Sequence, residues 1–176
     1  MCAVIRLAVR FCFAHNDNCG SIDNVNNATT LFPDEKWVRL DENLYIAQRR
    51  QNTKNKNEQQ KLDREIEQAK ILAGRGHKVF LVPETGSGKH YDTLVDEVPC
   101  ELKHIRGGIH ALRRRFTESR KQAKNVFLLI ENKEISLQTI RNVLKGEIKQ
   151  RGYKGGTIYV YVNGKFARWS VNEDLS

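Results

Sequence analysis

Apolar residues between positions 58 and 148 recur at intervals of three or four residues in three separate stretches. Such spacing predicts amphipathic helices, each with one apolar face. The first stretch is followed by Gly74 and Gly76 and the second is preceded by Gly107-Gly108, which separate the helices from what lies beside them. The predicted helices are Glu58–Ala73, Ile109–Ala123 and Leu137–Ile148.

Shorter apolar runs lie between these helices and predict strands. His77–Val82 precedes Pro83, and Asn125–Ile130 is continuously apolar, as is typical of a strand covered on both faces. Thr157–Val162 and Lys165–Trp169 flank Asn163-Gly164, a strong signal for a β-hairpin. The order of elements predicts an α/β domain with a central mixed sheet, helices on both sides and a C-terminal hairpin.

The segment from Asp92 to Lys103 carries the strongest chemical signal. It predicts two short strands joined by a turn, with Asp92 opening the first and Glu101-Leu102-Lys103 ending the second. Because strand side chains alternate with period two, Glu101 and Lys103 share one face. A carboxylate beside an ammonium, with a second carboxylate on the neighbouring strand, can hold a divalent cation and activate a water. Phosphodiester hydrolysis needs this arrangement.

The first 56 residues lack sustained periodicity. Asp23–Thr30 is rich in asparagine and Gln51–Asn57 is a polar linker, whereas Trp37–Ile46 is consistent with either short strands or a docking arm. We therefore expect residues 1–56 to be a partly ordered accessory segment and residues 57–176 to form the functional domain.

Charge narrows the range of partners. The 176 residues carry 30 Lys and Arg against 21 Asp and Glu, for a net charge of +9, which favours a polyanion such as nucleic acid. Arg6 and Arg10 interrupt the apolar N-terminus, so we predict neither a signal peptide nor a membrane span. The four cysteines include no CxxC pair and predict neither a zinc site nor a disulfide framework.

The order and spacing of these motifs resemble the PD-(D/E)xK nuclease superfamily, whose core is restriction-endonuclease-like. Within it, they resemble the C-terminal tRNase domain of contact-dependent growth inhibition (CdiA-type) toxins. The resemblance covers roughly residues 58 to 130, and Tyr91 stands where that family usually has proline. The matching features are the Ala-Gly-Arg-Gly-His end of the first helix, Val82-Pro83-Glu84, Tyr91-Asp92, Glu101-Leu102-Lys103 and Gln122-Ala123.

The resemblance implies that Asp92 and Glu101 bind metal and that Lys103 orients or deprotonates the attacking water. Hard oxygen ligands suit Mg²⁺ or Mn²⁺. The implied protein is a bacterial toxin that cleaves tRNA, is delivered into a target cell, acts in its cytoplasm and is neutralised by a cognate immunity protein. The alternatives are a DNA endonuclease of the same superfamily and a catalytically silent nucleic-acid-binding module.

Three further polar residues are candidates for the same site. Glu65 falls within the apolar stripe of the first helix, about 60° from Leu62 at about 100° per residue, where an unpaired carboxylate is costly. We interpret it as reaching the metal site, as the acid of the first helix does in the family. Glu84 either completes the site or caps a loop. Gln122 either reaches the site from the second helix or flanks it.

Basic and aromatic side chains suggest where a substrate binds. Arg113, Arg114, Arg115 and Lys121 crowd the second helix, and we interpret them as phosphate contacts. His104, His110 and Arg106 lie near the catalytic strand, where a structural role for the histidines is favoured over a general acid. The hairpin aromatics Tyr159, Tyr161 and Trp169 either stack on bases or pack in the core.

Overall fold

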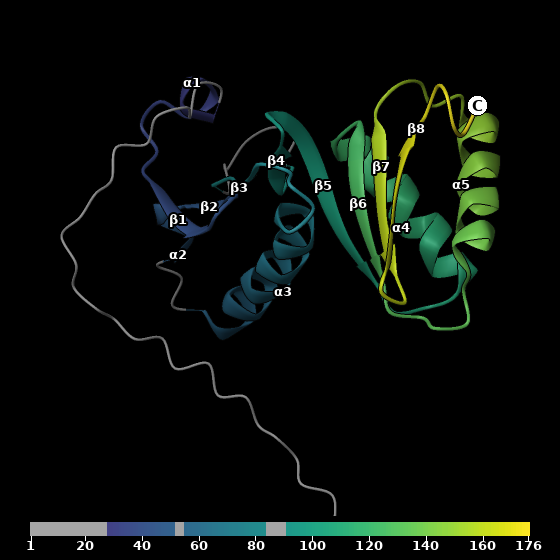
Figure 1. Ribbon diagram of the computed structural model, residues 1–176, viewed down its shortest axis with the longest axis horizontal. Coiled ribbons are helices and arrows are strands. Elements are labelled where there is room, and N and C mark those ends of the chain that lie inside the picture. Colours follow the sequence, from purple (N-terminus) through teal and green to yellow (C-terminus); the bar gives the residue numbers. More distant parts are fainter. Residues whose placement is uncertain (1–27, 52–54, 84–90) are drawn as a thin grey trace, which may run out of the picture.

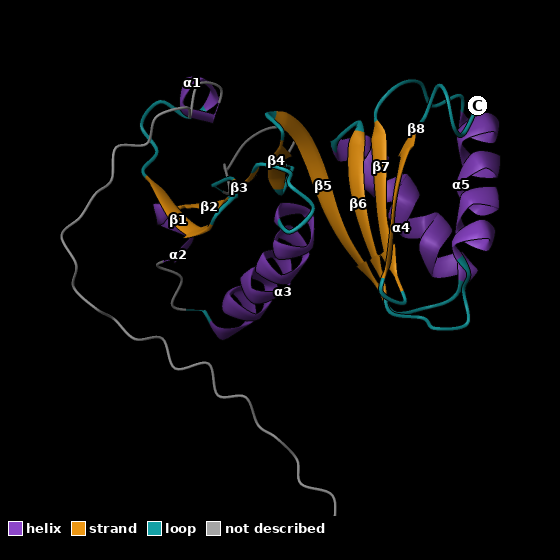
Figure 2. Ribbon diagram, viewed as in Figure 1, coloured by secondary structure: helices purple, strands orange, loops and turns teal. Residues whose placement is uncertain are grey.

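The computed structural model describes residues 28–51, 55–83 and 91–176. Within these ranges, eight strands form one sheet in chain order, β1 to β8, and helices lie on both of its sides (Figure 1). The predicted α/β class, mixed sheet, flanking helices and C-terminal hairpin are confirmed (Figure 2). The strands are β1 Trp37–Asp41, β2 Leu44–Ala47, β3 Val79–Leu81, β4 Thr93–Val95, β5 Val98–Ile105, β6 Asn125–Ile130, β7 Thr157–Val162 and β8 Lys165–Ser170.

The strand directions divide the sheet into parallel and antiparallel parts. The pairs β2–β3, β5–β6 and β6–β7 are parallel, and the remaining neighbours are antiparallel. Each parallel pair is joined by a crossover that contains a helix, as parallel strands require. The helices are α1 Ala28–Leu31, α2 Gln48–Gln51, α3 Lys56–Ala73, α4 Ile109–Gln122 and α5 Leu137–Arg151.

Alternate side chains of the central strands pack on opposite faces of the sheet, in two separate hydrophobic cores. On β6, Val126 and Leu128 pack with α4 and α5, whereas Phe127 packs in a second core with α3. Parallel pairing aligns Glu101 with Val126 and Lys103 with Leu128, so both polar side chains lie on the α4 side of the sheet. The continuously apolar β6 is therefore covered on both faces, as expected.

Residues 37–47 form two strands of the same sheet. β2 pairs with β3 in parallel, and Trp37 of β1 packs edge-on against Phe80 of β3, with their ring centroids 5.1 Å apart. Sequence interpretation assigned this stretch to an accessory segment that was partly ordered at best. Of the two alternatives for Trp37–Ile46, short strands or a docking arm, the structure shows short strands of five and four residues. The short helix α2 then carries the chain toward α3.

The unequal lengths of β4 and β5 create the site. β4 has three residues and pairs with Val98 to Cys100, whereas β5 has eight. The second half of β5 therefore extends past the end of β4 and pairs with β6 on its other edge. α3 covers the region beside this extension, so the segment that carries Glu101, Leu102 and Lys103 faces both a helix and an open pocket.

Candidate functional site

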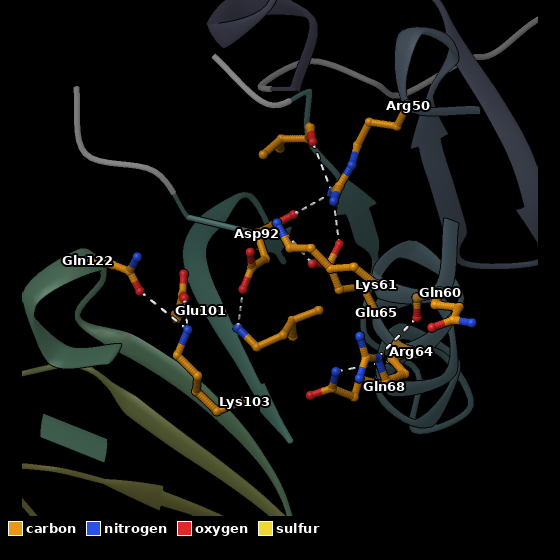
Figure 3. Close-up of polar contacts among 12 residues, drawn as sticks. Arg50, Gln60, Lys61, Arg64, Glu65, Gln68, Asp92, Glu101, Lys103 and Gln122 are labelled. Carbon is orange, nitrogen blue, oxygen red and sulfur yellow. Dashed lines mark hydrogen bonds and ion pairs between the residues drawn. The ribbon is translucent and has the colours of Figure 1, made fainter. Parts of the chain in front are cut away.

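Glu101 and Lys103 form an ion pair on one face of β5, as the period of two predicts. Lys103 also reaches α4, where its Nζ lies 3.4 Å from Oε1 of Gln122. Gln122 is thus in contact with the catalytic candidates, in keeping with the first of its two interpretations. The ammonium is held between a carboxylate and an amide oxygen (Figure 3).

Asp92 lies immediately before β4 and is fixed by the backbone of β5. Its Oδ2 accepts a hydrogen bond of 3.0 Å from the amide of Leu102. This bond places the carboxylate against the segment between Glu101 and Lys103 (Figure 3). Two sequence positions nine residues apart therefore present their carboxyl groups at one place.

Glu101 is buried in an electrostatically unfavourable position. Its exposed fraction is 1 %, and its Oε2 has no hydrogen-bond partner within the described ranges. Burial and then the Asp92 carboxylate raise the pKa of the Glu101 carboxyl and Lys103 lowers it, with the net result that the pKa is raised to about 7. Two carboxylates are both hydrogen-bond acceptors, so they repel each other unless a proton or a cation lies between them.

Glu65 is paired with an arginine that sequence analysis did not single out. Arg50 of α2 forms an ion pair with Glu65, and both side chains are 7 % exposed. The same guanidinium donates to the carbonyl oxygens of Val82 at 3.1 Å and Asp92 at 3.3 Å. Burial raises the pKa of Glu65 above its usual value and the Asp92 carboxylate adds to this, whereas Arg50 and Lys61 act in the opposite direction.

Glu65, Asp92 and Lys103 line a pocket of about 520 Å³ between α3, β5 and the start of α4. Most of its remaining charged lining is cationic. Such a surface attracts a polyanion. The carboxylates of Glu65 and Asp92 lie within this basic rim. The cationic residues are Lys61, Arg64, Arg106, Arg114 and Arg115, in addition to Lys103.

The arginine-rich helix presents its charges in two directions. Arg114 and Arg115 line the pocket that contains Asp92. Arg113 and Lys121, together with His110, line a separate groove beside α5, which Arg114 also borders. Arg113 lies 3.6 Å from the buried carboxylate of Glu147. The predicted phosphate contacts are therefore divided between two surfaces. Arg114 and Arg115 also approach Glu118, at 4.0 and 3.3 Å.

Other candidates have structural contacts. His104 lies 2.7 Å from a carboxylate oxygen of Glu131, and Arg106 lies 3.1 Å from the other oxygen. Tyr159 is 5 % exposed and packs beside Tyr161 in the core under α3, whereas Trp169 packs against the opposite core. These contacts fit the core-packing interpretation of the hairpin aromatics. Glu84, the remaining candidate for the site, lies outside the described residues.

Asp92 and Glu101 fit a divalent cation as a two-carboxylate site. Among described residues, no group of three or more His, Cys, Asp or Glu side chains is arranged to hold a metal ion. Mg²⁺ commonly uses one or two carboxylates and completes its shell with waters and substrate phosphate oxygens. The partnerless Oε2 of Glu101, buried beside a second carboxylate, is the atom that such an ion would satisfy.

Two functional candidates were missed in the sequence. Arg50 belongs to a stretch without periodicity, so nothing local connects it with Glu65. Gln68 is 3 % exposed and lines the pocket one turn after Glu65. A signal for Gln68 was present, because it follows Lys61 and Arg64 at intervals that place all three residues on neighbouring parts of one helix surface.

Comparisons with known proteins identify the fold. No protein-family model and no curated protein matches the chain. A solved structure does match, described as the CdiA-CT/CdiI toxin and immunity complex from Burkholderia pseudomallei. The match has a TM-score of 0.50 and 19% identity, and it covers 68% of this chain and 91% of that chain. The protein is therefore an α/β protein that shares its fold with a chain of a bacterial toxin–immunity complex. None of the helices in the described part could cross a membrane.

Proposed function

We propose that the protein is a metal-dependent nuclease that cleaves tRNA and acts as a toxin. The observation that carries this proposal is the buried Glu101 carboxylate, which lies beside Asp92 and Lys103, two residues that line a pocket with a cationic rim. Burying a carboxylate with a partnerless oxygen is costly, and the cost is offset when a cation binds there. A purely structural ion pair on a strand face needs neither the burial nor the second carboxylate.

Each side chain has a separate role in this proposal. Asp92 and Glu101 would hold Mg²⁺ or Mn²⁺, which neutralises charge on the scissile phosphate and makes a hydroxide available near neutral pH. The Leu102 amide fixes the orientation of Asp92. Lys103, held by Gln122, would orient the attacking water and, as an ammonium, stabilise the negative charge on the hydroxide that forms. Glu65 supports the same centre from α3.

Charge and fold support the substrate and the biological role. The net charge of +9 and the basic pocket rim suit a nucleic-acid backbone. The matched structure is described as a toxin with its immunity protein, which supports a toxin role and a cognate immunity partner for this chain. In this role the protein would be delivered into a target cell and would cleave tRNA in its cytoplasm.

Incubation of the purified protein with total tRNA and with plasmid DNA tests the proposal. Each reaction is run with Mg²⁺, with Mn²⁺ and with chelator, and Asp92→Ala serves as the matched inactive variant. The expected result is metal-dependent tRNA cleavage that chelator and the variant both abolish. Cleavage of plasmid alone would identify a DNA endonuclease. Tight binding without cleavage under any condition would identify a silent binding module and overturn the nuclease assignment.

A further inference from the structure

Gln68 presents a buried hydrogen-bond acceptor to the pocket that contains Asp92 and Lys103. The side chain is 3 % exposed, and its Oε1 has no partner in the part of the chain that the structure describes. Its amide nitrogen donates to the carbonyl oxygen of Arg64 at 3.1 Å. Figure 3 shows this amide on the side of α3 that faces β5.

The orientation of the Gln68 amide follows from chemistry. Rotating the amide by half a turn would set Oε1 against the Arg64 carbonyl oxygen, so that two acceptors would face each other. The Arg64 carbonyl therefore fixes Nε2 on the helix and leaves Oε1 as the acceptor. A buried acceptor without a partner is costly, so a ligand that donates to it gains affinity.

The cationic rim of the pocket restricts which ligand group can be the donor. Lys61, Arg64 and Arg115 line the pocket around Gln68 and suit the phosphates of a nucleic-acid backbone. A phosphodiester linkage has no hydrogen-bond donor, and neither does an internal deoxyribose. The ribose 2′-hydroxyl does donate, and it distinguishes RNA from DNA at a given site.

We infer that Gln68 is a specificity-determining residue whose Oε1 accepts a hydrogen bond from a ribose 2′-hydroxyl of the substrate. The inference rests on the proposed function and narrows it, because the sequence alone leaves RNA and DNA as alternatives. Gln68 selects the sugar, whereas Asp92, Glu101 and Lys103 act on the phosphate. Since α3 carries both Glu65 and Gln68, the selected ribose lies next to the scissile linkage.

Binding measurements with three forms of one tRNA-derived stem–loop test this inference. The forms carry ribose, 2′-fluoro-ribose or 2′-deoxyribose, and the 2′-fluoro form retains an RNA-like helix without the donor. Affinities are measured with Mg²⁺ in the Lys103→Ala background, where no cleavage is expected. Gln68→Met is the test variant. Gln59→Met is the matched control, because Gln59 is exposed on the same helix and contacts Asp63.

The unsubstituted Gln68 protein is expected to bind the ribose form about tenfold more tightly than the 2′-fluoro form. Gln68→Met should lower the affinity for the ribose stem–loop to that for the 2′-fluoro stem–loop, and should leave the affinity for the 2′-fluoro stem–loop unchanged. Gln59→Met should change neither affinity. Affinity ratios within one protein do not depend on the folded fraction. A persistent ribose preference in Gln68→Met overturns the inference, and so does an equal loss for both forms, which would indicate a base contact or a packing role.

The result of the Gln68 binding test can be told apart from the result of the cleavage test of the proposed function. A protein that cleaves neither tRNA nor plasmid refutes the nuclease proposal and leaves the affinity ratios measurable. Metal-dependent tRNA cleavage combined with ratios that Gln68→Met does not alter supports the nuclease and rejects the role of Gln68.

Discussion

Arg50 and Glu65 form an ion pair in which each side chain is only 7 % exposed, and this pair connects α2 with the candidate site. Arg50 also donates to the carbonyl oxygens of Val82 and Asp92, so it ties the end of the β3 region to the start of β4. A residue from the first 56 positions thus contributes to the geometry around Asp92. Removing residues 1–56 should therefore disrupt the site as well as the sheet.

Arg50→Met is expected to lower the free energy of unfolding by about 3 kcal/mol, because it leaves Glu65 buried without its arginine. The double variant Arg50→Met/Glu65→Gln should recover much of this loss, since the uncompensated charge is gone. Glu65→Gln alone should lower the cleavage rate by about a hundredfold, or about 3 kcal/mol in barrier. Denaturant unfolding and single-turnover cleavage measure these effects. Equal stability of the single and double arginine variants would contradict the pairing argument.

Asp92→Ala and Glu101→Gln are each expected to abolish metal-dependent cleavage. Both substitutions remove one of two carboxylates that would hold the cation, and neither removes an apolar group from the core. Cleavage of tRNA with Mg²⁺ is the measurement, and circular dichroism checks the fold. Glu131→Gln is a suitable control, because this carboxylate contacts His104 and Arg106 instead. Wild-type cleavage by either test variant would refute the proposed centre.

Lys103→Ala should remove turnover while metal binding persists, because an ammonium donates hydrogen bonds and cannot ligate a cation. Removing it also frees Glu101 from its ion pair, so the affinity for Mg²⁺ or Mn²⁺ should be equal to or higher than that of the parent. Calorimetric titration of metal in the absence of substrate measures this. Complete loss of metal binding would argue against the division of roles between Lys103 and the carboxylates.

Metal binding should depend on pH because the pKa of Glu101 is raised to about 7, mainly by burial and then by Asp92. A proton competes with the cation below that pH, so metal affinity should rise about tenfold per unit up to about pH 7 and then level off. In chelator, the folded state keeps a proton that the unfolded state has lost. Stability should therefore fall as pH rises from about 4.5 to about 7. Glu101→Gln should lack both contributions, and identical pH profiles for parent and variant would contradict this assignment.

The two groups of basic residues on α4 should differ in their effect on substrate binding. Replacing Arg114 and Arg115 with Gln removes charges from the pocket and should make the slope of log K against log salt shallower by about one to two units. Replacing Arg113 and Lys121 removes the same number of charges from residues that line the groove beside Glu147 but not the pocket, and should have a smaller effect. Affinity for tRNA between low and moderate salt is the measurement. Equal slopes for the two double variants would show that both surfaces contact RNA.

Much of the fold could be predicted because its signals are local. The spacing of Leu62, Ala69 and Leu72 predicts α3, and Asn163-Gly164 predicts the β7–β8 turn. The shared face of Glu101 and Lys103 follows from strand geometry alone, and the structure bears it out with a direct ion pair. These features depend on backbone periodicity within a few residues, so no knowledge of distant contacts is needed.

The chemistry around these elements depends on contacts between distant parts of the chain. Arg50 meets Glu65 and Asp92 because β2 pairs with β3, and no local pattern encodes that pairing. Arg113 and Arg115 are two positions apart yet line different surfaces, since successive helical residues point about 100° apart and packing decides where each points. The burial of Glu101 and Gln68 likewise arises from the surfaces that close over them. Residue types and periodicity thus specify which groups are available, whereas long-range packing sets their burial, their partners and their pKa values.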